Sequence, residues 1–522
     1  MCSGALRAAA LLGWLATLSL HVLAASSPEV STDTGVLQGL RSGEGDGASF
    51  LGIAYAAAPV GKLRWMAPQP QGPWTGVREA TGYGPACPQL PEPWLAQPVW
   101  SEDCLYLNIW TPQLSSRARL PVIVFFHGGS NRAGYSQLTP LGPALSALGV
   151  VVVTASYRLG PLGFLAHPAL TAASPHHASG NYGILDQIEV LRWVGRNIAG
   201  FGGDAERITV MGQSAGAFDL CLMMASPLAR GLFQQAILES GDCESALIED
   251  IRKPIHVSGI RGTGEGSGEA LSAALGVAGD NDVLAKLRAI PAERVLAAAA
   301  RDRATAFDAI VDGWVIPEQP ARVFAQGRQL HIPVLVGSNA DEATVFGPGP
   351  MTVADYRKLL QADAGAYSPE ELHLWPAATD REVPAQYLRL QNAIFAYGAW
   401  SMARAMSRVG EPAFLYRFTW NGAGKRARLG AYHGEELTFL SESFPDEWVA
   451  VDGEERFGTI LRSYWTNFAK TGHPDGPGLP AWPPFNPQTD LLLELGKPIR
   501  SVPAGSEVLA LHRITQRILK AH

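Results

Sequence analysis

Short apolar runs that alternate with helix-length segments are the feature that most limits how this chain can fold. Residues 121–126, 150–156, 207–211, 234–238 and 332–338 are rich in β-branched side chains and lack polar alternation. Such runs are typical of strands with both faces buried. Strands that alternate with helices predict an α/β fold with a mostly parallel sheet.

A helix is clearest over residues 182–203, YGILDQIEVLRWVGRNIAGFGG, where apolar side chains recur at helical spacing until Gly200 ends the pattern. A glycine-rich segment follows at residues 258–269. No strand run precedes it, and its glycines never complete the G-x-G-x-x-G spacing of a phosphate-binding loop. We therefore expect a flexible surface loop there.

The composition is that of an ordinary globular protein and argues against a nucleic-acid partner. Of the 522 residues, 47% are hydrophobic and 17% are charged, and the formal net charge is -7. The chain therefore has no basic surplus with which to neutralise phosphates.

The first 24 residues have the features of a secretory signal peptide. Arg7 precedes an apolar stretch, and the small residues of VLAA suit cleavage after Ala24. The alternative is a membrane anchor, but Gly13 and His21 interrupt the short apolar run. The chain has no Asn-x-Ser/Thr site, which favours a bacterial protein. We expect a secreted or periplasmic protein with no integral membrane segment in the mature chain.

The pentapeptide GQSAG, residues 212–216, lies between a strand run and the helical segment AFDLCLMMA. A G-x-S-x-G sequence at a strand-to-helix turn is typical of a nucleophile elbow, because only small neighbours admit so sharp a turn. The turn holds the serine hydroxyl at the carboxyl end of the sheet, beside a helix N-terminus. Ser214 is therefore predicted to be a nucleophile.

A serine nucleophile needs a base to remove its proton and an acid to orient that base, and in such folds the acid and then the base follow the serine. The strand run 332–338 is followed by three candidates, Asn339, Asp341 and Glu342, of which the last two are acidic. The candidate base is His433, which follows the strand run 413–420.

These motifs and others resemble type-B carboxylesterases, the α/β-hydrolase family that includes cholinesterases, bacterial para-nitrobenzyl esterases and non-catalytic neuroligins. The matching stretches include SEDCLYLNIW, SYRLGPLGFL, FGGDAERITVMGQSAGA, VGSNADEATVF and HGEELTFL. The resemblance implies an α/β-hydrolase fold over residues 25–522 as a single domain, with a mostly parallel central sheet, flanking helices, and large loop and helical insertions.

The resemblance also implies a catalytic triad. Ser214 resembles the nucleophile, Glu342 the triad acid and His433 the general base. Glu342 is preferred over Asp341 because the acid of this family is the Glu of its D-E pair. Asp341 is interpreted as a helix cap. Glu436 resembles a carboxylate near the histidine, although a solvated helix charge is an equal alternative.

Three backbone N–H groups form the oxyanion hole in this family, and the resemblance places them at Gly129, Ser130 and Ala215. Ser130 stands where a third glycine is usual, and a non-glycine residue is disfavoured at positive φ. We therefore expect a changed loop geometry or less well aimed N–H groups. Nearby, Arg132 leads to the hypothesis of an acyl group that carries a carboxylate, the alternative being a solvated arginine.

Residues around this site both depart from and match the pattern of the family. Gln213 stands where many relatives, cholinesterases included, carry glutamate, which predicts no preference for cationic esters. Two residue pairs resemble structural ion pairs of the family, namely Arg64 with Glu102 and Arg158 with Asp186.

The resemblance implies a disulfide between Cys87 and Cys104. The enclosed loop is shorter than in cholinesterases, so a cholinesterase assignment is not supported. Cys221 and Cys243 match no usual family loop and are either paired or free thiols.

Two functions are consistent with these features. The first is a secreted serine carboxylesterase that hydrolyses small-molecule carboxylic esters through an acyl-enzyme on Ser214. The second is a catalytically inactive, neuroligin-like adhesion or binding module of the same fold, which the intact set of Ser214, Glu342 and His433 disfavours. The enzyme requires no organic cofactor, and a lone His127 at a strand end is poor evidence of a metal site. Neither the natural ester nor the oligomeric state is indicated.

Overall fold

The computed structural model describes residues 27–42, 46–244, 247–254, 262–279, 282–301, 307–347, 349–422, 426–441 and 452–521. The predicted signal peptide, residues 1–24, lies outside these ranges. Within the described ranges, no helix combines the length and the apolar character needed to cross a membrane.

Eleven strands of the described chain form one large sheet in the order β14-β13-β12-β11-β10-β9-β7-β8-β6-β4-β3. The strands from β13 to β8 are parallel, and the remaining strands at both edges are antiparallel. The strand bounds are β3 (Leu40–Arg41), β4 (Ala48–Ala54), β6 (Tyr106–Thr111), β7 (Leu120–Phe126), β8 (Val151–Ala155), β9 (Gly203–Gln213), β10 (Gln235–Glu239), β11 (Val334–Asn339), β12 (Ala413–Phe418), β13 (Leu491–Leu495) and β14 (Arg500–Pro503). The mostly parallel sheet predicted from the sequence is confirmed.

Each predicted apolar run is a strand of this sheet, and its side chains alternate between two cores. On β7, Val122, Val124 and Phe126 contribute to one core, whereas Ile123 and Phe125 contribute to the other. Because both faces are buried, neither face needs polar residues, and the runs therefore lack polar alternation.

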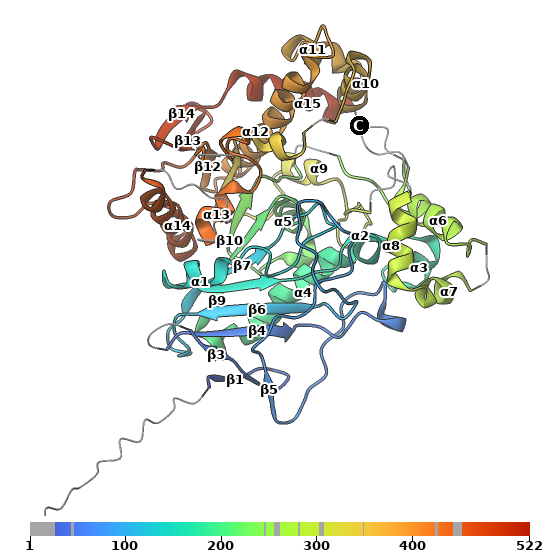
Figure 1. Ribbon diagram of the computed structural model, residues 1–522, viewed down its shortest axis with the longest axis vertical. Helices are drawn as coiled ribbons and strands as arrows, with labels where there is room; N and C mark the ends of the chain where they lie inside the picture. Colours follow the sequence, from blue (N-terminus) through green and yellow to red (C-terminus); the bar gives the residue numbers. More distant parts are fainter. Residues whose placement is uncertain are drawn as a thin grey trace, which may run out of the picture.

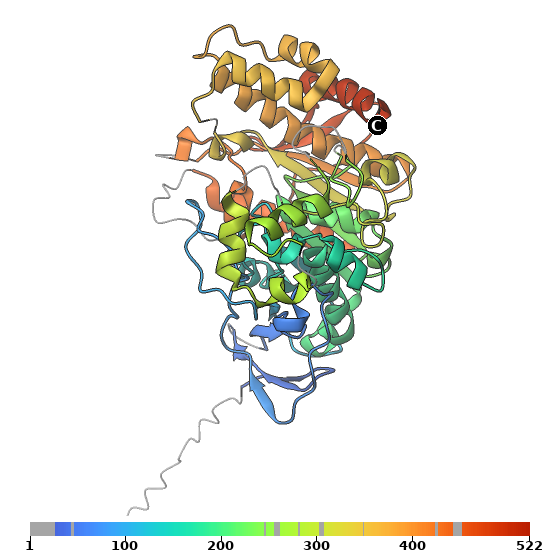
Figure 2. The ribbon, with the colours of Figure 1, turned by 90° about the vertical axis from the view of Figure 1, so that its right-hand side faces the viewer.

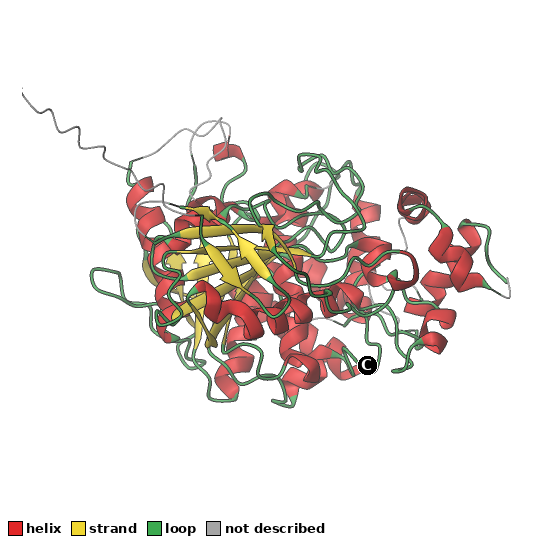
Figure 3. Ribbon diagram, turned by 90° about the horizontal axis from the view of Figure 1, so that it is seen from below, coloured by secondary structure: helices red, strands yellow, loops and turns green. Residues whose placement is uncertain are grey.

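Helices cover both faces of the sheet, as Figure 3 shows. One core is shared with α4 (Tyr182–Asn197), α5 (Ala215–Ala225) and α12 (Val383–Arg408). The other core is shared with α1 (Leu141–Ser146), α13 (Glu435–Ser441) and α14 (Glu454–Thr471). This arrangement confirms the α/β-hydrolase architecture, with helices on both sides of one sheet.

Further helices form groups beside the sheet (Figures 1 and 2). One group contains α3 (Pro168–Ala173), α6 (Gly264–Ala274), α7 (Val283–Ala289) and α8 (Ala292–Arg301). A second group packs on α12 and contains α10 (Val353–Ala364), α11 (Ser368–Leu374) and α15 (Ser506–Ala521). The remaining helices are α2 (Gly160–Phe164) and α9 (Pro320–Ala325), and the small sheet consists of β1 (Glu29–Ser31), β2 (Val36–Gln38) and β5 (Val77–Glu79).

Short 3₁₀ turns join several of these elements. They are η1 (Gly61–Leu63), η2 (Ile198–Phe201), η3 (Pro227–Ala229), η4 (Glu342–Val345), η5 (Gly365–Tyr367) and η6 (Arg426–Arg428).

Two expectations about local structure were wrong in part. The helix predicted over residues 182–203 ends at Asn197, because the chain tightens into η2 and then turns left-handed at Gly202 (φ 82°). The segment 258–269 is not a loop throughout, since α6 begins at Gly264; residues 258–261 lie outside the described chain. Thr263 starts this helix by accepting a hydrogen bond from the Gly266 N–H, which outweighs the low helix propensity of its glycines.

Both predicted ion pairs form. Arg64 binds Glu102 through Nε at 2.7 Å and through a second guanidinium nitrogen. Arg158 makes two bonds of 2.7 Å to Asp186, and both side chains are buried. Removing one partner of such a buried pair typically costs about 3–5 kcal/mol of stability.

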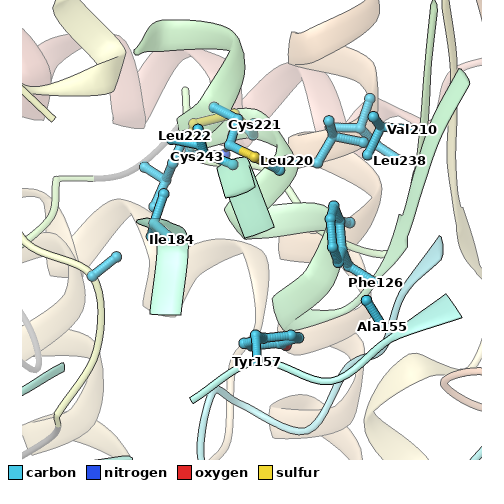
Figure 4. Close-up of a cluster of buried hydrophobic side chains, with 14 of the residues drawn as sticks. Phe126, Ala155, Tyr157, Ile184, Val210, Leu220, Cys221, Leu222, Leu238 and Cys243 are labelled. Atoms are coloured by element: carbon cyan, nitrogen blue, oxygen red, sulfur yellow. Dashed lines mark hydrogen bonds between the residues drawn. A yellow bond between two sulfur atoms is a disulfide. The ribbon is translucent and has the colours of Figure 1, made fainter. Parts of the chain in front are cut away.

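The structure joins Cys87 to Cys104 and Cys221 to Cys243. The second disulfide connects α5 to the segment that follows β10, amid buried side chains that include Leu220, Leu222 and Leu238 (Figure 4). Of the two alternatives for Cys221 and Cys243, the structure therefore shows the paired one.

Candidate active site

Ser214 lies on the sharp turn between β9 and α5, with φ 56° and ψ -124°. Such a conformation typically costs about 1–3 kcal/mol for a residue with a side chain, so its surroundings must hold it. A Cβ at Gly212 would lie 2.3 Å from the Gly216 carbonyl oxygen, and one at Gly216 would lie 2.2 Å from that of Phe126. The two glycines of GQSAG are therefore required by close backbone contacts.

Backbone hydrogen bonds fix this turn. The Ser214 N–H donates to the Glu239 carbonyl at the end of β10, at 2.8 Å, and the Ser214 carbonyl accepts from Ala217 and Phe218 at 2.9 Å. The side chain lies at the N-terminus of α5, where the helix dipole favours developing negative charge. Ser214 is partly exposed at the carboxyl end of the parallel strands.

Glu342 and His433 meet at the same edge of the sheet. His433 Nδ1 lies 2.5 Å from Glu342 Oε2, and Glu342 Oε1 accepts the Asn339 N–H at 2.7 Å. Glu342 is fully buried, and the His433 side chain is 9% exposed. Burial alone would lower the pKa of His433, but the charge and hydrogen bond of Glu342 outweigh it and raise the pKa above the ordinary histidine value.

Two aromatic rings flank His433. The ring centroid of Phe346 lies 4.9 Å from that of His433, and the centroid of Phe395, on α12, lies 5.3 Å away. Together with the bond to Glu342, these contacts restrict the orientation of the imidazole.

Asp341 does not cap a helix, contrary to our expectation. Its side chain makes no cap bond to η4, and Oδ2 accepts the Ala431 N–H at 2.9 Å instead. The Asp341 N–H also donates to the Ala431 carbonyl at 2.9 Å. Asp341 therefore ties the end of β11 to the segment that carries His433. Its carboxylate bonds a residue far away in the sequence and does not cap the short turn that follows it.

The free edge of the imidazole faces Gln213. Gln213 Nε2 lies 3.1 Å from His433 Nε2. Between these described residues, no hydrogen bond joins the Ser214 hydroxyl to His433. Catalytic hydrogen bonds are often absent or long until substrate is present. Sequence reasoning assigned Gln213 an electrostatic role and missed this direct contact.

The loop after β7 has three consecutive residues with positive φ: Gly129 (116°), Ser130 (54°) and Asn131 (53°). Ser130 thus adopts the left-handed conformation that a glycine would adopt at less cost. The backbone N–H groups of Gly129, Ser130 and Ala215 donate to no other group within the described ranges. A Cβ at Gly128 would lie 2.8 Å from Ser214 Cβ, which places this loop against Ser214.

Two side chains from the segment between Cys87 and Cys104 contact this loop and the residues that follow it. Trp94 is 59% exposed, and its ring would lie 3.5 Å from a Cβ at Gly129, so it contacts the loop. Gln89 binds both the N–H and the carbonyl of Gly134 at 2.9 Å. The segment between Cys87 and Cys104 therefore packs on the candidate oxyanion loop.

Arg132, in the same loop, is exposed, and its positive charge lowers the pKa of the Asp308 carboxyl group in part, against the larger effect of burial.

Buried carboxyl groups lie behind the triad candidates. Glu436 is fully buried and hydrogen-bonds the Asn339 side chain, so it is not a solvated charge. Burial, and then the charge of Glu342, raise the pKa of Glu436 to about 7. Glu239 accepts the Trp465 indole N–H at 2.9 Å. Sequence reasoning named Asn339 only as one of the residues that follow the strand run 332–338, and it did not single out Glu239, which ends β10 at the edge where sites form in α/β folds.

No group of three or more His, Cys, Asp or Glu residues in the described chain is arranged to hold a metal ion. His127 is buried and stacks on Tyr157 at 4.6 Å between centroids, and burial lowers its pKa to about 4. Its Nδ1 lies 2.8 Å from the Gly128 carbonyl oxygen, so the ring packs against the start of the loop.

The sheet, the helices on its two faces and the elbow between β9 and α5 define an α/β-hydrolase. A solved PNB esterase structure superposes with a TM-score of 0.80 at 31% identity and covers 93% of this chain and 100% of its own.

The carboxylesterase family profile matches residues 26–507, and the chain belongs to this family. Fumonisin B1 esterase of Sphingopyxis macrogoltabida is 36% identical over 479 residues, which cover 88% of this chain and 85% of that protein. Para-nitrobenzyl esterase of Bacillus subtilis (strain 168) is 34% identical, with 88% and 93% covered. The family and these relatives support hydrolysis of carboxylic esters.

Proposed function

We propose that this protein is an exported serine carboxylesterase that hydrolyses carboxylic esters through an acyl-enzyme on Ser214. The observation that supports it most is one convergence: the strained Ser214, the His433–Glu342 pair and three N–H donors share one edge of the sheet, and these donors have no partner among the described residues. A nucleophile, an oriented base and preorganised donors are the parts that acyl transfer needs.

In the proposed mechanism, Ser214 Oγ attacks the ester carbonyl carbon while His433 Nε2 accepts the hydroxyl proton. The N–H groups of Gly129, Ser130 and Ala215 stabilise the oxyanion of the tetrahedral intermediate. The intermediate collapses, the bond to the alcohol breaks, and His433 returns the proton to the alcohol. Water then attacks the acyl-enzyme in the same way and releases the acid and the free Ser214.

Glu342 supports these steps by holding His433. Its carboxylate accepts a hydrogen bond from Nδ1–H, so that Nε2 of the neutral ring presents a lone pair to Ser214. It also stabilises the imidazolium that forms in each half-reaction. His433 must first exchange its contact with Gln213 for one with Ser214.

Release of p-nitrophenol from p-nitrophenyl acetate tests this function. Because removal of a triad serine typically costs about 10³-fold or more in kcat, Ser214→Ala should be nearly inactive. Equal activity of the two proteins would refute the mechanism. An inactive wild type would favour the neuroligin-like alternative.

Substrate charge is a second part of the proposal. Arg132 is exposed beside the oxyanion loop, where its cation suits an acyl group that carries a carboxylate. Asp308 opposes part of this charge. Arg132→Ala should therefore lower kcat/KM for succinate monoesters by about threefold to tenfold, the worth of a partly exposed ion pair. An equal loss on butyrate esters of the same alcohols would contradict this role.

Export is the third part. We propose that residues 1–24 form a cleaved signal peptide and that residues 25–522 form one hydrolase domain, secreted or periplasmic. The two disulfides support this location, since such bonds persist in oxidising compartments. Amino-terminal sequencing of the exported protein should begin at Ala25, and an intact residue 1 would contradict cleavage.

A further inference from the structure

The side chain of Asn131 is buried beneath the candidate oxyanion loop, where it meets two carboxyl groups. Asn131 is 0% exposed. Its Nδ2 donates to Asp219 Oδ1 at 2.9 Å and to Asp308 Oδ1 at 2.8 Å. These residues lie 88 and 177 positions away in the sequence. One amide thus joins three separate parts of the chain.

Asp219 connects Asn131 to the helix that follows the proposed nucleophile, Ser214. It lies on α5, the helix that begins at Ala215 directly after Ser214. Its other oxygen, Oδ2, accepts Gln187 Nε2 from α4 at 2.6 Å. Asn131 therefore links the loop that carries two of the proposed oxyanion donors to the helix that carries the third.

The loop needs such a tie because of its backbone. Ser130 and Asn131 both have φ near 54°, a region that side chains other than glycine seldom occupy. Strained conformations persist only where the surrounding structure holds them. Besides its side chain, Asn131 contributes a carbonyl that accepts the Gly160 N–H at 2.6 Å.

The buried carboxyl groups make this tie costly to lose. Burial raises the pKa of Asp219 to about 8, because water is excluded and few donors face the carboxyl group. Among the described residues, its side-chain donors are the amides of Asn131 and Gln187. A buried acceptor that loses a donor favours rearrangement of the loop.

We propose that Asn131 is a positioning residue for the oxyanion hole. Its amide, anchored by Asp219 and Asp308, fixes the N–H groups of Gly129 and Ser130 relative to that of Ala215. The inference rests on the proposed serine esterase function and deepens it, because it says how a loop without the third glycine keeps its donors aimed.

Asn131→Gly tests this role, because glycine keeps the left-handed backbone at little cost and removes only the amide. We expect kcat for p-nitrophenyl acetate to fall about 10- to 100-fold, somewhat less than the loss of one whole oxyanion donor. KM should change less than about threefold. The affinity for a trifluoromethyl ketone, whose serine adduct carries an oxyanion, should weaken by the same factor as kcat/KM.

Asn197→Ala is the matched control. Asn197 is also buried, and its side chain also makes two hydrogen bonds, to the Asp33 N–H at 2.8 Å and the Trp193 carbonyl at 3.0 Å, at the far end of α4. This variant should lose thermal stability but keep the kcat and the ketone affinity of the wild type.

Asp219 offers a second test if Asn131→Gly folds poorly. Asp219→Ala removes the anchor on α5 and should lower kcat by a factor similar to that of Asn131→Gly. Asp219→Asn retains an acceptor for Asn131 and should lower kcat less.

Three outcomes would overturn the inference: kcat within twofold of wild type in Asn131→Gly, a fall in kcat without weaker ketone binding, or equal losses in both Asp219 variants. The activity of Ser214→Ala is measured alongside these variants as the test of the proposed function. If Ser214→Ala kept full activity, the proposed function itself would fail, which is a distinguishable result.

Discussion

At the scale of single residues, the site differs from a bare triad by the contact between Gln213 and His433. The neutral amide of Gln213 lies 3.1 Å from His433 Nε2, the nitrogen proposed to accept the serine proton. Gln213 therefore contacts the proposed base directly, and it also leaves Ser214 without a neighbouring negative charge.

Replacing this amide by a carboxylate should change substrate preference. Wild type should hydrolyse choline esters no faster than neutral 3,3-dimethylbutyl esters of the same shape. Gln213→Glu should raise the ratio of kcat/KM for choline over neutral esters by about fivefold, which corresponds to a Coulomb energy near 1 kcal/mol. A wild type that already prefers choline esters would overturn this interpretation.

The contact between Glu342 and His433 predicts how the activity depends on pH. Because His433 must be neutral to act as a base, activity should rise as pH passes its pKa, which Glu342 holds above the ordinary value. Glu342→Gln should lower kcat by about 10²- to 10⁴-fold and move the acidic limb of the kcat/KM profile to lower pH. A limb that stays in place would show that Glu342 does not set the pKa of His433.

At the scale of elements, the site depends on ties between strand ends and loops far apart in sequence. Asp341, two residues after the end of β11, holds Ala431 by two hydrogen bonds of 2.9 Å and thereby fixes the segment that carries His433. The oxyanion loop is held in an analogous way from α5 through Asn131.

Asp341→Ala tests the first tie. It leaves the buried Ala431 N–H without its acceptor, which should lower the free energy of unfolding by about 1–3 kcal/mol and lower kcat by about tenfold, as His433 loses its fixed position. The matched control is Asp341→Asn, which keeps an acceptor oxygen and should lose less of both. Unchanged kcat in Asp341→Ala would show that the tie is not needed.

Those ties also mark the limit of sequence reasoning. The elbow at residues 212–216 and the strands around it follow local patterns, so they could be predicted. The contacts of Gln213 with His433, and of Asn131 with Asp219, join residues 220 and 88 positions apart. Such pairs leave no periodic signal. The start of α6 depends on the cap at Thr263, and the glycine-rich composition of this segment led to the prediction of a loop instead.

At the scale of the whole molecule, buried carboxyl groups make stability depend on pH. Burial is the largest cause that raises the pKa of Asp219 and of Glu244 to about 8, and that of Glu436 to about 7. In the unfolded chain these groups titrate near pH 4. Between about pH 5 and 8 the folded protein therefore holds protons that the unfolded chain has released.

The free energy of unfolding should consequently fall as pH rises from 5 to 9, because the folded state binds more protons in this window. The rise in the pKa of His433 acts in the same direction. Calorimetry at constant ionic strength should show a falling Tm, and Glu244→Gln should flatten the slope above pH 6. A Tm that rises between pH 6 and 8 would contradict these protonation states.

The central claim is that Ser214 is the nucleophile, and covalent labelling tests it most directly. After treatment with a fluorophosphonate, peptide mass spectrometry should find one phosphonyl group per chain, on Ser214. Labelling should be lost in Ser214→Ala and be strongly slowed in a His433→Ala variant. A label on another residue, or an unreactive protein that still hydrolyses esters, would contradict the account.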